Sequence, residues 1–179
     1  VLRRLFQFLI SISEDGLKAA EKNNATELKA LTLRDDSINR TADFCRRCLN
    51  KSRNKSPGTT YHIIEQLERI GDAYKEIFKD FIKNKKQRKE IITYYKNIND
   101  FLTDFYKIFY KFDVTKLEEL HKTKINLDKN SEDIYKAINK DQANTLNNLS
   151  KIKDYIFEMN GSIMINSFHS RNAGWTLWI

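Results

Sequence analysis

Apolar residues recur along almost the whole chain at alternating steps of three and four residues, the spacing of one buried stripe on a helix. The clearest stripe consists of Ile91, Tyr95, Ile98, Leu102, Phe105, Phe109 and Phe112. The 179 residues include only five glycines and one proline, too few for the many turns of a β-protein. The pattern therefore predicts an all-α fold of long helices with few connections.

Six helices are predicted where the stripes run without interruption: residues 2–22, 26–53, 59–83, the region around 91–112, residues 114–138, and a last helix after 139–141. Ser56-Pro57-Gly58 predicts a loop, and Thr59 or Thr60 can cap the helix after it. Asp113 is the predicted N-cap of helix 114–138. Each helix spans roughly 30 to 40 Å, and short links between such rods produce six long antiparallel helices.

A weak internal repeat divides these helices into two sets of three. Leu67, Ile70 and Asp72 align with Leu149, Ile152 and Asp154. We therefore expect two three-helix-bundle repeats, at about 1–84 and 86–168, followed by a tail at 169–179 that contains Trp175 and Trp178. The helix around 91–112 carries a second apolar stripe, which fits either a central bundle helix or a contact between two copies in a homodimer.

Acidic residues four apart on two neighbouring helices are the main candidates for a binding site. Glu68 and Asp72 stand one turn apart on the same side of their helix, and Asp35 and Asn39 have the same spacing on the preceding helix. Stacked carboxylates repel one another unless a metal ion, a facing Lys or Arg, or water lies between them. Three carboxylates and an amide oxygen suit Mg, Mn or Fe, and suit Zn less well without His.

The alternative to a metal is that each acid has a basic neighbour. By sequence proximity, Arg34 or Arg40 would pair with Asp35, and Arg69 and Lys75 would pair with Glu68 and Asp72. Acidic pairs of this spacing are common on helix surfaces. Spacing alone leaves both interpretations open.

The segments Leu67-Glu68-Arg69-Ile70-Gly71-Asp72 and Arg34-Asp35-Asp36-Ser37-Ile38-Asn39-Arg40 resemble the PhoU family of phosphate-uptake regulators, and most closely its archaeal members. The resemblance covers about residues 1–168. It implies an all-α fold of two three-helix repeats, with metal ions bound by paired acidic motifs on facing helices. It also implies a role between the high-affinity phosphate transporter and phosphate-responsive signalling.

Carried over to this sequence, the resemblance implies a metal site at Asp35, Asn39, Glu68 and Asp72, with Fe, Mn, Mg or Zn as the ion. Asn39 stands where many family members have Asp. A second, degenerate metal site is expected at Asp154 and Glu158, where Ser150 replaces the expected Glu. Some archaeal relatives carry a DNA-binding module upstream, and a chain that begins with Val1 fits the loss of such a segment.

These observations favour a non-enzymatic regulator of phosphate uptake and phosphate homeostasis that contacts a phosphate transporter subunit or a phosphate-signalling protein. The sequence contains no Gly-rich phosphate cradle and no evident nucleophile–base pair. No apolar run approaches the roughly 18 residues of a membrane span, so we expect a cytoplasmic protein without membrane insertion. One alternative is the cytoplasmic PhoU-like domain of a sodium–phosphate cotransporter.

A formal net charge of +8 raises a further alternative, a basic helical bundle that binds nucleic acid. The basic residues gather in two clusters, near 46–55 and 83–89, which antiparallel helices would place at opposite ends of the bundle. We therefore expect nucleic-acid binding only through an additional N-terminal module. The pair Cys45 and Cys48 lacks the further ligands of a zinc site, and Cys45 continues an apolar stripe as a core residue.

Overall fold

The computed structural model describes residues 1–51, 57–84 and 87–171, and these form helices with short connections. The helices are α1 (Leu2–Glu21), α2 (Ala25–Leu33), α3 (Asp35–Lys51), α4 (Pro57–Lys83), α5 (Lys89–Tyr110), α6 (Val114–Ala137) and α7 (Lys140–Arg171). No strand occurs in the described part of the chain. The predicted all-α class is confirmed, and Trp175 and Trp178 lie outside the described residues.

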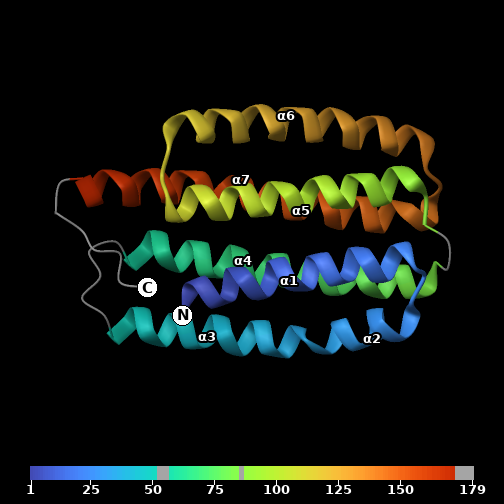
Figure 1. Cartoon of the computed structure of the whole chain (residues 1–179), viewed down its shortest axis with the longest axis horizontal. Coiled ribbons are helices and arrows are strands. Elements are labelled where there is room, and N and C mark those ends of the chain that lie inside the picture. Colours follow the sequence, from blue (N-terminus) through green and yellow to red (C-terminus); the bar gives the residue numbers. More distant parts are fainter. Residues whose placement is uncertain (52–56, 85–86, 172–179) are drawn as a thin grey trace.

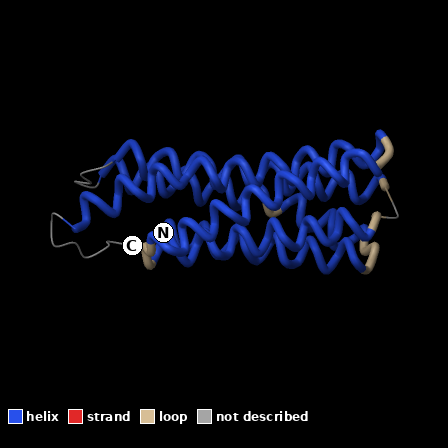
Figure 2. The backbone as a smooth tube through the Cα atoms, turned by 90° about the horizontal axis from the view of Figure 1, so that it is seen from above, coloured by secondary structure: helices blue, strands red, loops and turns tan. Residues whose placement is uncertain are grey.

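The helices are rods that run along the long axis of the molecule (Figures 1 and 2). They form two bundles, one of α1, the nearly collinear α2 and α3, and α4, and the other of α5, α6 and α7 (Figure 1). The most extensive packing between the bundles joins α4 to α7, and α1 also packs on α5. No helix in the described residues is both long and apolar enough to span a lipid bilayer.

The second predicted helix is broken at Arg34, which corrects the prediction of one continuous rod. Its stripe runs through Leu28, Leu31, Asp35 and Ile38, so a carboxylate occupies a position that faces the core. Ending α2 at Leu33 and beginning α3 at Asp35 places this carboxylate in the first turn of a new helix. The positive end of the helix dipole stabilises an acidic side chain there.

Two local predictions about helix ends have different outcomes. Asp113 caps α6 as predicted, since its carboxylate accepts hydrogen bonds from the backbone N–H groups of Thr115 and Lys116. Thr59 and Thr60 are not caps, because α4 already begins at Pro57. Proline is tolerated in the first turn of a helix, where its missing N–H would have no helical partner.

The core where α1, α4 and α5 meet contains a buried polar network. The Ser13 carbonyl oxygen accepts hydrogen bonds from Tyr95 Oη and Asn99 Nδ2, both at 3.0 Å. Tyr74 Oη donates to Asn99 Oδ1 at 2.9 Å. Gly16 lies one turn further along α1, and a Cβ atom there would lie only 2.2 Å from the Phe78 ring. The hydrogen bonds fix the axial positions of α1, α4 and α5 relative to one another. Gly16 allows α1 to pack close to its two neighbours.

Candidate functional site

Asp35 is the most deeply buried of the predicted metal ligands, with 3% of its side chain exposed. The ammonium group of Lys75, which comes from α4, lies 2.6 Å from Asp35 Oδ2. Asn39 Nδ2 donates to the same oxygen at 3.3 Å. Asp35 Oδ1 and Asn39 Oδ1 are buried without a hydrogen-bond partner. The buried carboxylate therefore already has a cation, which crosses from the neighbouring helix.

Glu68 is paired with a second basic side chain that crosses between the same two helices. Arg46 extends from α3 and forms an ion pair with the Glu68 carboxylate on α4. The same guanidinium binds Asp43 at 3.0 Å and lies 5.7 Å from the centre of the Tyr61 ring. The side-chain hydrogen bond with Glu68 raises the pKa of the Arg46 guanidinium above its ordinary value. Arg46 is thus held in place on three sides.

Asp72 lies close to both of these carboxylates. Partial burial raises the pKa of Asp72, and the nearby charges of Asp35 and Glu68 raise it further, while Lys75 acts in the opposite direction. The structure therefore brings the four predicted residues together along facing sides of α3 and α4. Within the described residues, however, no three His, Cys, Asp or Glu side chains lie so that they could share one metal ion.

The metal ion that the sequence resemblance implies therefore does not fit these side chains as they lie. Two unpartnered oxygens, on Asp35 and Asn39, are suitable donors. Two of the carboxylates already have cations. Lys75 binds the second oxygen of Asp35, and Arg46 binds Glu68. A dication would have to displace at least one of these side chains. Metal binding by these four residues stays a prediction, and the regulatory role does not depend on it.

The ion pairs differ in part from those suggested by sequence proximity. Lys75 binds Asp35, Arg34 binds Asp15 on α1, and Arg69 binds Glu65 on its own helix. The role of Arg46 was missed, because the pair with Glu68 joins residues 22 positions apart in the sequence. Only the expected antiparallel packing of the two helices could have indicated it.

The second predicted site is arranged differently. Glu158 of α7 accepts a hydrogen bond from Gln66 Nε2 of α4 at 2.9 Å, and Asp154 is half exposed at 3.4 Å from Lys153. The ammonium group of Lys153 is bound to Asp128 on α6, and only 6% of the lysine side chain is exposed. Lys124 lies 2.7 Å from the other oxygen of Asp128. The carboxylate at the α6–α7 contact is therefore held by two lysines.

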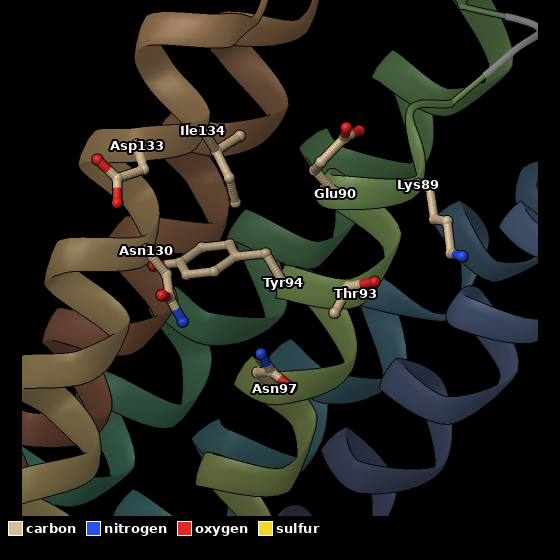
Figure 3. A pocket seen from close by; sticks show the side chains of 8 residues that line it. All are labelled: Lys89, Glu90, Thr93, Tyr94, Asn97, Asn130, Asp133 and Ile134. Atoms are coloured by element: carbon tan, nitrogen blue, oxygen red, sulfur yellow. The ribbon is translucent and has the colours of Figure 1, made fainter.

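A hollow of about 450 Å³ opens between α5 and α6 (Figure 3). Its lining residues are Lys89, Glu90, Thr93, Tyr94, Asn97, Asn130, Asp133 and Ile134. The Tyr94 ring reaches from α5 towards Asn130 on α6, and the Lys89 side chain points away from α6. Glu90 and Asp133 outnumber Lys89 among the charged lining residues, so the hollow has no excess positive charge to attract an anion such as phosphate. The lining offers no pair of nucleophile and base.

We expect Asp72→Asn to raise the midpoint of thermal unfolding by about 1–3 °C at pH 7, because it removes a carboxylate that is partly buried and that two others repel. A folded-state pKa above the ordinary value means that the ionised Asp72 costs stability at neutral pH. The cost disappears as the pH falls through that raised pKa, so the two proteins should converge in acid. Circular dichroism melts between pH 3 and 7 measure both effects. A metal ligated by Asp72 would reverse the sign at pH 7.

Comparison with known proteins shows the fold. The crystal structure of the phosphate transport system regulatory protein PhoU from Streptococcus pneumoniae matches this chain with a TM-score of 0.77 at 16% sequence identity. The match covers 99% of this chain and 94% of the other. No protein-family model matches the sequence. No curated protein matches it either. The predicted PhoU-like fold is confirmed over nearly the whole of this chain.

Proposed function

We propose that the chain is a PhoU-like regulator of phosphate uptake and phosphate homeostasis that acts through protein–protein contacts rather than by catalysis. The observation that carries this proposal is the whole-chain match to a phosphate transport system regulatory protein. The match extends over nearly all of both chains and is not confined to one segment. The arrangement of all rods, rather than one shared motif, supports the assignment.

The chemistry of the surface supports a binding role. The carboxylates of Asp35 and Glu68 between α3 and α4 are engaged by Lys75 and Arg46, so these two acids are not free to act as a base. Two aromatic side chains on the same pair of helices, Phe44 and Tyr61, are 53% and 44% exposed. Exposed aromatic groups beside an arginine are typical of protein-binding surfaces. The partner we propose is a phosphate transporter subunit or a phosphate-signalling protein in the cytoplasm.

Deletion of the gene in its source organism tests the proposal. We expect uptake of radiolabelled phosphate to stay high when phosphate is plentiful, because the transporter has lost its negative regulator. Reintroducing the intact gene should restore the decline in uptake, and a copy with an early stop codon should not. Unchanged uptake in the deletion strain at both high and low phosphate would refute the proposal.

The same strains separate the two alternatives. A cytoplasmic domain of a sodium–phosphate cotransporter would act only on sodium-dependent uptake, so the effect of the deletion would vanish in sodium-free medium. A nucleic-acid-binding bundle would bind duplex DNA with an affinity that falls roughly a thousandfold or more over a fourfold rise in salt. We expect no such binding by the purified chain, because the ends of α3 and α4, which carry the described basic residues of the two clusters, lie at opposite ends of the bundle (Figure 1).

A further inference from the structure

The α3–α4 and α6–α7 contacts have the same construction. In each, an amine from the later helix crosses to a carboxylate on the earlier helix: Lys75 to Asp35, and Lys153 to Asp128. In each, one member is almost fully buried, with 3% of Asp35 and 6% of the Lys153 side chain exposed. A buried charge is tolerated only when it is paired. The two pairs are therefore required by the packing, not incidental surface contacts.

The two least exposed carboxylates at the α3–α4 contact each have a cation without an added ion. Three carboxylates, on Asp35, Glu68 and Asp72, meet two cations, on Lys75 and Arg46. The remaining negative charge belongs to Asp72, the most exposed of the three acids. Exposed charges are screened by solvent and need no partner. A divalent cation would have to compete with Lys75 for Asp35 and with Arg46 for Glu68.

We propose that side-chain cations hold these helix pairs together in place of metal ions: Lys75 and Arg46 join α3 to α4, and Lys153 joins α6 to α7. The bundle then folds and keeps its shape without any metal. The proposal concerns the scaffold, and it stands or falls separately from the role in phosphate uptake.

The test compares thermal unfolding of the full-length wild-type chain with that of Lys75→Met, a change that keeps the length of the side chain and removes its charge. Wild type should unfold at the same temperature, within about 1 °C, after chelator treatment and after addition of excess Mn²⁺, Mg²⁺, Zn²⁺ or Fe²⁺. Lys75→Met should unfold roughly 5–10 °C lower, because Asp35 loses its cation while it remains buried. The emptied position should then accept a metal, so Mn²⁺ should stabilise this variant alone.

Lys79→Met is the matched control one turn further along α4. Its ion pair with Glu76 has a similar N–O distance of 2.6 Å, but 44% of Lys79 and 53% of Glu76 are exposed. Exposed pairs contribute little, so this variant should unfold within about 1–2 °C of wild type. If Lys75→Met does not fold, the double variant Asp35→Asn/Lys75→Met removes both charges and should recover most of the loss.

Two results would overturn the proposal. One is a wild-type protein whose unfolding midpoint falls by several degrees after chelator treatment and recovers when a single metal is added back. The other is a Lys75→Met variant as stable as Lys79→Met, which would mean that the ammonium group contributes nothing to the helix pair.

Discussion

Gly16→Ala is expected to lower the free energy of unfolding by about 2–3 kcal/mol, which corresponds to a fall of roughly 5–10 °C in the unfolding midpoint. The added Cβ would lie 2.2 Å from Phe78 Cε1 and 2.7 Å from Tyr95 Oη. Both rings are fully buried and cannot move without disturbing their neighbours. The clash also displaces the hydroxyl group that binds the Ser13 carbonyl. Urea unfolding followed by circular dichroism measures the change.

Gly161→Ala is the control for this substitution. Gly161 lies on the exposed side of α7, and a Cβ there would meet nothing within 4 Å. Alanine is the better helix former, so this variant should be up to about 1 kcal/mol more stable than wild type. A loss of stability in Gly16→Ala together with a gain in Gly161→Ala would show that the loss arises from the packing of α1. Equal effects would contradict the close approach of α1, α4 and α5.

Asp128→Asn is expected to destabilise the protein by about 2–3 kcal/mol at pH 7, again roughly 5–10 °C in the unfolding midpoint. The substitution leaves the buried Lys153 ammonium with only Asp154 nearby, at 3.4 Å. Burial by itself raises the pKa of Asp128, but hydrogen bonds from Lys124 and Lys153 outweigh it and lower the pKa below its ordinary value of 3.8. A depressed carboxyl pKa contributes stability above the ordinary pKa, and this is lost as the pH falls through the folded-state value.

The pH dependence checks the origin of this effect. The difference in unfolding midpoint between wild type and Asp128→Asn should stay constant from pH 7 to about pH 4 and shrink below that. Asp133→Asn is the control on the same helix, because its pair with Lys136 is 73–76% exposed and should contribute almost nothing. A difference that persists unchanged at pH 2 would show that the charge of Asp128 is not responsible.

The fold was largely predictable because each rod carries its own apolar stripe. The stripe of α5 predicted buried residues that are buried in the structure, such as Ile91, Tyr95 and Ile98, and Cys45 is a core residue as expected. The break at Arg34 was not predictable, since neither Gly nor Pro marks it. We attribute the break to the burial of the Asp35 carboxylate. The burial of this side chain depends on how α3 packs against α4, which the local sequence does not determine.

The sequence predicted that the four candidate residues lie near one another, but it did not predict their bonding. Sequence spacing placed Asp35, Asn39, Glu68 and Asp72 on facing helix sides, where the structure has them. It did not predict that Lys75 would bind the acid on the other helix, or that Arg46 would reach Glu68. Which cation binds which carboxylate depends on the axial offset of the two helices, and no local pattern determines this offset.

The pairing of α4 with α7 has a consequence for how the chain is made. Gln66 and Glu158, which join these helices, are 92 positions apart. At about 5–20 residues per second, the ribosome needs roughly 5–20 s to supply the partner of α4 after α4 itself has been synthesised. During that interval the face of α4 that later packs on α7 has no native partner. Newly made chains are therefore most prone to associate with one another, or to bind a chaperone, between the synthesis of α4 and that of α7.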